Sequence, residues 1–334
     1  MSDARRYSGS LIGQCLGDAL GFVVEGERPE VCREYVEGIL KAGRVGECGR
    51  TSFPFGQYSD DSQLARELLQ SYAECERFDP RDYARRIALI FVENRIVGRG
   101  RATEQAAWRL AAGVPWEEAG TPSPSAGNGS AMRAGPIGLL FSDDPEEMVR
   151  AAHDQGRITH RDPRCSAGAV AVAGAVALAV GGGEIEAGRF LSQLAEWAAP
   201  FEGSVSDALR QLVEWTSLPP EEAVAFVSGI GYNPDYPDEV QGISPFVTTS
   251  VLWSLYSFLR SPNDYRETVC TAIAVGGDVD TTAAMAGAIS GGYLGLDAIP
   301  ERWARCVTDQ GTWGYHELVE LARRCHRLKI RLDM

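Results

Sequence analysis

Two short acidic segments contain the residue types that bind hard cations. Each combines two carboxylates with a hydroxyl where a helical pattern begins. The members are Ser59, Asp60 and Asp61 in YSDDSQL, and Asp278, Asp280 and Thr281 in GGDVDTT. Carboxylate and hydroxyl oxygens are the ligands that Mg²⁺ prefers. A helix N-terminus also favours carboxylates for local reasons, so one cluster alone would be explained by capping. Two such clusters predict a metal site.

Two further segments have features of ligand binding. RITHRDPRCSAG places His160 and Asp162 just before an Ala-rich helical pattern, and SAGNGSAMRAGPIG is a Gly-rich loop that leads into a helix. Free N–H groups at such a loop can hold a phosphate or diphosphate. The loop lacks the Walker lysine and a preceding strand, so it is neither a P-loop nor a dinucleotide fingerprint. Beside a metal site it predicts a phosphorylated ligand, with N–H dipoles, bound Mg²⁺ and Arg133 or Arg161 expected to supply positive charge.

Helical periodicity dominates the sequence that positions these residues, and alternating β-branched runs are absent. Loop composition separates the helical segments, most clearly at 120–129 and 229–245. The sequence therefore predicts an all-α fold, a compact multi-helix bundle in a single domain over 1–334. Helices are expected at 8–24, 60–76, 80–97, 102–112, 130–141, 145–156, 164–181, 186–198, 205–216, 247–260, 264–275, 280–294 and 313–329.

Three of the expected helices are rich in small residues. Gly9, Gly13, Gly17 and Gly21 recur every fourth residue and so lie on one ridge of the first helix. The segments after Ser166 and Asp280 are rich in Ala and Gly as well. Glycine inside a helix costs about 0.8–1 kcal/mol relative to alanine, so several are useful only where backbones approach closely. These three helices are expected to cross near the centre of the bundle.

Composition excludes several classes of function. The 334 residues include 46 acidic and 32 basic side chains, a net charge of −14, which argues against nucleic acid or an anionic membrane as the main partner. The opening MSDARRYSGS lacks an apolar core, so no secretory signal is expected, and the apolar run 167–180 is too short to span a bilayer. Eight scattered cysteines without C-x-x-C, and four histidines, make zinc improbable. We expect a cytoplasmic protein with reduced thiols.

Read together, the motifs resemble those of the ADP-ribosylglycohydrolase family, which includes dinitrogenase reductase-activating glycohydrolase and the ADP-ribosylarginine and ADP-ribosylserine hydrolases. The similar segments, in chain order, are LIGQCLGDALGFVVEG, YSDDSQL, GNGSAMRAGPIG, ITHRDPR and GGDVDTTAAMAGAISGGYLG. They extend from about residue 8 to residue 296, so the resemblance covers nearly the whole chain.

The resemblance implies an all-α fold of this family that binds two Mg²⁺ ions, or Mn²⁺, at the base of a cleft. It implies that Glu25 is the acidic residue near the scissile bond, and Asp61 ranks slightly ahead of it as the general base. The implied metal ligands are Ser59, Asp60, Asp61, Asp278, Asp280 and Thr281. The implied substrate-binding residues are Gly127, Asn128, Gly129, Ser130, Met132 and His160.

One segment departs from the family pattern. In GISPFVTTSVLW, Ile243 stands where some members have a tyrosine that stacks on adenine, and Ser244 replaces a valine. Tyr232 or Tyr236, just upstream, could substitute for that tyrosine, although packing is the commoner role of a loop tyrosine.

The expected activity is cleavage of ADP-ribose from a modified protein or a small-molecule conjugate. ADP-ribosylarginine is the first candidate, with serine, nucleobase and small-molecule acceptors also open. The alternatives are a non-catalytic ADP-ribose-binding or crystallin-like member of the same fold, and a metal-dependent phosphohydrolase. The sequence leaves the oligomeric state open.

Overall fold

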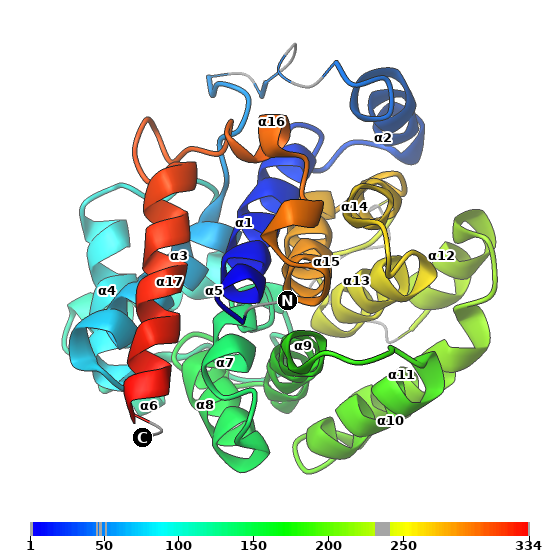
Figure 1. The fold of residues 1–334 in the computed structure, drawn as a ribbon. Helices are drawn as coiled ribbons and strands as arrows, with labels where there is room; N and C mark the ends of the chain where they lie inside the picture. The colour runs from blue at the N-terminus through cyan, green and yellow to red at the C-terminus, as the bar shows by residue number, and fades with distance from the viewer. Residues whose placement is uncertain (1–2, 45, 47–48, 51, 231–240, 333–334) are drawn as a thin grey trace.

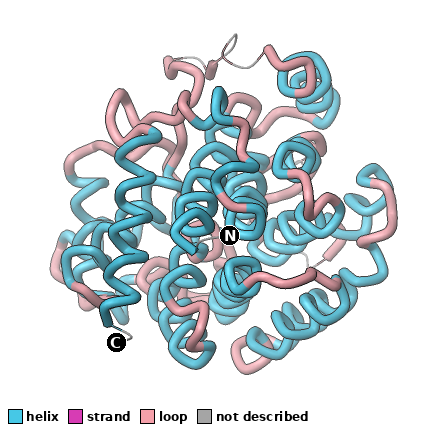
Figure 2. The backbone as a smooth tube through the Cα atoms, viewed as in Figure 1, coloured by secondary structure: helices cyan, strands magenta, loops and turns pink. Residues whose placement is uncertain are grey.

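A computed structural model describes residues 3–44, 46, 49–50, 52–230 and 241–332. Within these ranges the chain is helical, and β-structure is limited to isolated bridges. The predicted all-α fold is therefore confirmed (Figure 2).

The helices mostly follow the predicted order. They are α1 (Asp3–Phe22), α2 (Pro29–Tyr35), the π-helical η1 (Val36–Leu40), α3 (Asp60–Cys75), α4 (Pro80–Val92), α5 (Arg101–Ala111), α6 (Trp116–Ala119), the 3₁₀ turn η2 (Asn128–Ser130), α7 (Gly135–Leu140), α8 (Pro145–Arg157), α9 (Pro163–Gly181), α10 (Ala187–Ala198), α11 (Gly203–Trp215), α12 (Pro220–Ser228), α13 (Val247–Arg260), α14 (Tyr265–Ile273), α15 (Val279–Leu294), the 3₁₀ turn η3 (Leu296–Ala298), α16 (Glu301–Ala304) and α17 (Tyr315–Leu332).

Several expected boundaries were wrong. The helix expected at 130–141 is instead a 3₁₀ turn at 128–130, a further turn at 131–133, and then α7, which begins at Gly135 with a proline in its first turn. The helix expected at 80–97 ends at Val92. The helices α2 and α12 were not predicted, and both begin with a proline at the first helical position.

The helices α1 and α15 pack backbone to backbone at the centre of the bundle (Figure 1). A Cβ added at Gly13 would lie 2.3 Å from the carbonyl oxygen of Gly287, and one added at Gly9 would lie 2.3 Å from that of Gly291. The pairing runs in opposite chain directions, so the two helices are antiparallel. Glycine is required here because any side chain would separate the backbones, as the spacing of the glycine ridge predicted.

Other helices surround this central pair. The helices α3, α4 and α17 lie on one side of it, and α13 and α14 lie on the other (Figure 1). The Ala-rich α9 packs against α7, α8, α13 and α15. In the described ranges, α9 is the one helix long and apolar enough to cross a membrane, but 83% of that window is buried inside the fold.

Candidate active site

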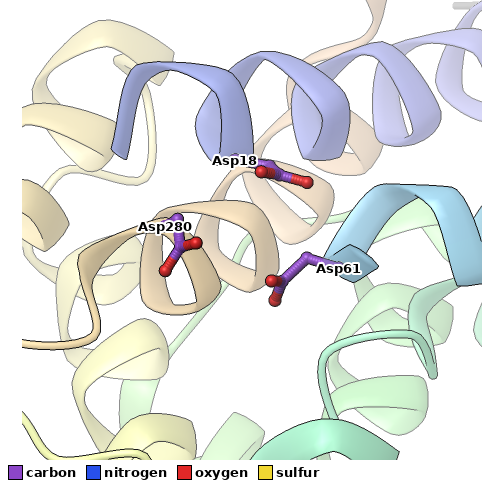
Figure 3. Close-up of side chains that lie close together, drawn as sticks. All are labelled: Asp18, Asp61 and Asp280. Carbon is purple, nitrogen blue, oxygen red and sulfur yellow. The ribbon is translucent and has the colours of Figure 1, made fainter. Parts of the chain in front are cut away.

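Three helix ends meet at the floor of a cleft, and each contributes a buried aspartate. Asp18 comes from α1, Asp61 from α3 and Asp280 from α15 (Figure 3). One carboxylate oxygen from each lies within 4.8 Å of the others. Glu25, Asp278 and Asp280 form a second trio with the same spacing, so Asp280 belongs to both. Two overlapping carboxylate trios are an arrangement that could hold two cations through one shared ligand.

Asp18 was missed by sequence reasoning. It is fully buried, and its two oxygens accept hydrogen bonds from the backbone N–H groups of Ser59 (2.8 Å) and Ser62 (3.0 Å). Asp18 therefore fastens the start of α3, and with it the SDD motif, to the central helix α1. The available signal was one acidic residue within the apolar stretch LGDALG, which a buried helix tolerates only where the carboxylate has partners.

Asp61 has one satisfied and one unsatisfied oxygen. The Ser59 hydroxyl donates to Asp61 Oδ2 at 2.9 Å, whereas Asp61 Oδ1 is buried without a hydrogen-bond partner. A buried carboxylate oxygen left unpaired costs free energy unless something binds it. The donor set therefore fits a divalent cation. Ser59 does not line the cleft, so its hydroxyl serves Asp61 in this structure.

Burial makes the ionised site costly without a cation. Burial, with further contributions from neighbouring carboxylates, raises the pKa of Asp60 to about 7 and that of Asp278 to about 6. Burial raises the pKa of Asp18 to about 7, although hydrogen bonds from Ser59 and Ser62 oppose the change. Burial and nearby acids raise the pKa of Asp61 and Asp280 well above the ordinary aspartate value. Positive charge at the floor of the cleft would offset these costs.

The other predicted acidic and hydroxyl residues also lie at this end of the fold. Asp60 lines the cleft outside both trios, and a Cβ at Gly98 would lie 2.7 Å from its Oδ1. Asn128 donates a side-chain hydrogen bond to Asp278. Thr281 lines the cleft, and its backbone N–H donates to Asp280 Oδ1 at 2.8 Å.

The cleft has a volume of about 660 Å³, within the usual range for small-molecule sites. Of the predicted substrate-binding residues, those that line it are Gly127, Asn128, Gly129, Met132 and His160. Ser130 is fully buried instead, and its hydroxyl donates to the Cys165 carbonyl at 2.9 Å. Hydrogen bonds from the Asn128 N–H to the Pro245 carbonyl (3.0 Å) and from the Val247 N–H to the Ala126 carbonyl (2.9 Å) tie the Gly-rich loop to the start of α13.

The two arginines predicted as sources of positive charge were wrong. Arg133 is fully buried and Arg161 is exposed, and neither lines the cleft. Arg28, Arg99 and Arg101 line it instead. The latter two belong to the segment GRGR, which leads into α5 and brings that helix's N-terminus to the cleft. The two glycines in this segment, close to Asp60, were the signal that sequence reasoning did not use.

Ile243 supports the site through its backbone hydrogen bonds and not through its side chain. Its side chain is fully buried in the core and does not line the cleft. Its N–H donates to the Gly276 carbonyl (3.0 Å), and its carbonyl accepts from the Asp278 N–H (2.8 Å), so it holds the entry to α15. The Ile243 side chain is therefore not part of the cleft wall. Tyr232 and Tyr236 lie outside the described residues.

Comparison with known proteins agrees with this fold. The family model described as ADP-ribosylglycohydrolase matches residues 1–332. The chain is 30% identical to ADP-ribosylhydrolase ARH3 of Xenopus tropicalis over 351 residues, covering 98% of this chain and 96% of the relative. It is 26% identical to ADP-ribosylarginine hydrolase Tri1 of Pseudomonas putida over 325 residues, covering 93% and 75% respectively.

A solved structure titled ADP-ribosylglycohydrolase-related protein complex is also similar. It has a TM-score of 0.72 and 28% identity, and the match covers 98% of this chain and 99% of that one. The all-α fold, the cleft with carboxylates at its floor and these similarities together indicate an ADP-ribosyl hydrolase. The chain belongs to the ADP-ribosylglycohydrolase family.

Proposed function

We propose that this protein is a Mg²⁺-dependent hydrolase that cleaves the glycosidic bond between ADP-ribose and a modified acceptor. The observation that carries the proposal is the pair of carboxylate trios sharing Asp280 at the floor of a cleft that the Gly-rich loop also lines. A loop with free N–H groups suits the diphosphate, and the carboxylates suit cations beside a ribose. Family membership supports the same activity.

The residues that would hold two Mg²⁺ ions, or Mn²⁺, are those with oxygens at the floor. The unpartnered Asp61 Oδ1 is the strongest indication of fit. When bound, the ions supply positive charge that orients the ribose hydroxyls and offsets the buried carboxylates. The proposed ligands are three members of the trios, Asp61, Asp278 and Asp280, together with Asp60 and Thr281 in the cleft lining. Ser59 acts through its hydrogen bond to Asp61. Asp18 does not line the cleft and instead accepts hydrogen bonds from the N–H groups of Ser59 and Ser62.

Two acids are assigned to proton transfer. Asp61 is placed first because it lines the cleft floor next to the other carboxylates. Glu25 is second: its side chain is 36% exposed in the cleft wall and forms an ion pair with Arg50. Cleavage of a glycosidic bond develops positive charge on the sugar, which this concentration of carboxylates stabilises.

The acceptor most compatible with the cleft is a cationic group such as arginine. Glu25 and Glu27 both line the cleft, and Glu25 adjoins the floor through Asp278 and Asp280. A guanidinium leaving group would gain attraction from these carboxylates that a neutral serine hydroxyl would not. The substrate we propose is therefore an ADP-ribosylarginine protein or a related small conjugate, in a cytoplasmic setting.

The test is release of free ADP-ribose from ADP-ribosylarginine and ADP-ribosylserine peptides, each with Mg²⁺ and with excess chelator. We expect metal-dependent release that is faster from the arginine peptide, and none from Asp280→Ala. Release from the serine peptide alone would overturn the acceptor assignment. Release of inorganic phosphate in place of ADP-ribose would show a phosphohydrolase and overturn the reaction.

A non-catalytic ADP-ribose-binding member of the fold is the second candidate. It keeps the Gly-rich loop and needs no acidic floor. The convergence of both trios on Asp280 favours catalysis over this alternative. Binding of ADP-ribose with no turnover of either peptide, at any Mg²⁺ or Mn²⁺ concentration, would establish the binding protein instead.

A further inference from the structure

Arg133 follows the Gly-rich loop, and its side chain lies entirely inside the protein. None of the ion pairs among the described residues includes it. Its Nε donates to the Gln155 side-chain oxygen at 3.0 Å, and its Nη2 donates to the Gln155 carbonyl (3.0 Å) and to Thr159 Oγ1 (2.7 Å). Burying a guanidinium without a carboxylate partner costs free energy of folding, which suggests that the contacts of Arg133 have a functional role.

The contact with Thr159 continues to the cleft. Thr159 Oγ1 lies 2.8 Å from His160 Nδ1. A guanidinium has donors only, so Arg133 must donate to the Thr159 oxygen. The Thr159 hydroxyl hydrogen then has one acceptor within reach among the described residues, which is His160 Nδ1. If His160 Nδ1 instead donated to Thr159 Oγ1, the Thr159 hydroxyl hydrogen would be buried without an acceptor.

The other edge of the His160 ring faces the Gly-rich loop. A Cβ added at Gly129 would lie 2.7 Å from His160 Cε1 and 3.2 Å from Nε2. The ring lines the cleft, and its backbone is fixed by hydrogen bonds from the Thr121 N–H to the Thr159 carbonyl and from the Arg161 N–H to the Thr121 carbonyl, both 2.8 Å. Because Nδ1 accepts, the proton of a neutral ring belongs on Nε2.

We infer that Arg133 is a positioning residue that, through Thr159, holds His160 as the Nε2–H tautomer, so that His160 donates a hydrogen bond to an acceptor oxygen of the ligand. Burial and the charge of Arg133 lower the pKa of His160 to about 3, which keeps the ring neutral at working pH. His160 thus binds substrate as a donor and does not act as a proton acceptor. The tautomer stands independently of the reaction, whereas the ligand contact rests on the proposed function.

The test is a long-range ¹H–¹⁵N NMR spectrum of the four histidine rings, with His160 assigned by its loss in His160→Gln. We expect Nε2 protonated and Nδ1 unprotonated and hydrogen-bonded, unchanged between pH 5 and pH 8. In Thr159→Val the Nδ1 signal should move to that of an unbonded nitrogen, and ADP-ribose should bind roughly 10-fold more weakly. Thr159→Ser, which keeps the hydroxyl, should restore both.

Thr268→Val is the matched control, because Thr268 is a buried threonine on α14 whose hydroxyl donates one hydrogen bond to the Ser261 carbonyl (3.0 Å) outside the cleft. It should lower the melting temperature without changing the His160 signals or the affinity. A protonated Nδ1 in the native protein, or an unchanged Nδ1 signal in Thr159→Val, would overturn the inference. If the tautomer is as expected but ADP-ribose leaves the His160 signals in place, the ligand contact fails while the hydrogen-bond relay stands, and release of ADP-ribose from the peptides decides the proposed function separately.

Discussion

On α1, Gly21 packs directly against the backbone of Asp280. A Cβ there would lie 2.5 Å from Asp280 Cα and 2.6 Å from Asp280 N. Carbon atoms in ordinary contact are about 3.5 Å apart, so Gly21→Ala must push the Asp280 backbone away by about 1 Å. Mg²⁺ holds its oxygen ligands at about 2.0–2.1 Å in a near-ideal octahedron, so a shift of this size displaces a ligand out of range. We expect metal affinity to fall by at least roughly 10–100-fold, the range found for perturbed metal sites.

Gly9→Ala provides the matched control. A Cβ at Gly9 would lie 2.3 Å from the Gly291 carbonyl oxygen, so the clash is as severe, but Gly9 is twelve residues or about 18 Å along α1 from Gly21. Both variants gain about 1 kcal/mol of helix propensity and lose about 1–3 kcal/mol or more to overpacking, so both should be destabilised. Gly181→Ala, at the end of α9 with no atom within 4 Å of the added Cβ, should be neutral or slightly stabilised.

The assay separates stability from metal binding. Melting temperatures in excess chelator report the packing cost, and titration of the chelated protein with Mn²⁺ or Mg²⁺ in a calorimeter reports the affinity. The expected result is similar destabilisation of the Gly21 and Gly9 variants, with metal affinity lost only in the first. Equal metal affinity in both variants would refute the claim that the α1–α15 contact sets the geometry of the floor.

Three other predictions follow from the same geometry. Since the folded pKa values of Asp18 and Asp60 are about 7 and that of Asp278 about 6, against 3.8 ordinarily, the folded metal-free protein binds more protons than the unfolded chain between about pH 4 and pH 7. Its stability should fall as pH rises through that window, so the rise in melting temperature on adding Mg²⁺ should be larger at pH 8 than at pH 5.5. A Mg²⁺ effect independent of pH would count against this prediction. Asn128→Ala removes a hydrogen bond to Asp278 and should weaken metal binding roughly 10-fold with little change in melting temperature under chelator; unchanged metal affinity by calorimetry would contradict this. Arg101→Ala removes a cation from the cleft wall and should weaken ADP-ribose binding by about 0.5–1 kcal/mol at low salt, with the difference vanishing at high salt; equal affinities at low salt would exclude a role for this charge.

The parts of the fold that the sequence predicted well are those with strong local patterns. The four-residue glycine spacing on α1 predicted a close helix contact, which the structure confirms against α15. The helices α2 and α12 are only seven and nine residues long, too short for periodicity to stand out. The end of the Gly-rich loop was predicted to be the start of a helix because its residues are small. Its conformation depends instead on hydrogen bonds to residues at the start of α13, which are distant in sequence.

In the candidate site, too, features with a local sequence pattern were predicted and features that depend on tertiary contacts were not. The two acid–acid–hydroxyl segments were visible because each is local, and the structure brings them together at one floor. Asp18 could not be assigned to this floor from the sequence, because its partners Ser59 and Ser62 are more than forty residues away. Arg133 looked like a ligand-binding charge because it adjoins the loop, but tertiary packing turns it inward to Gln155 and Thr159. Burial of a charged group is a property of the assembled fold and has no local sequence pattern.

The most direct test of the account is turnover as a function of metal added back to chelated protein. With an ADP-ribosylarginine peptide as substrate, we predict no release of ADP-ribose under chelator, recovery on titration with Mg²⁺, and no recovery at any Mg²⁺ concentration in Asp280→Asn, which removes one carboxylate from both trios while keeping its size. Full activity in excess chelator, or a wild-type rate in Asp280→Asn, would contradict the claim that the shared carboxylate floor is a catalytic metal centre.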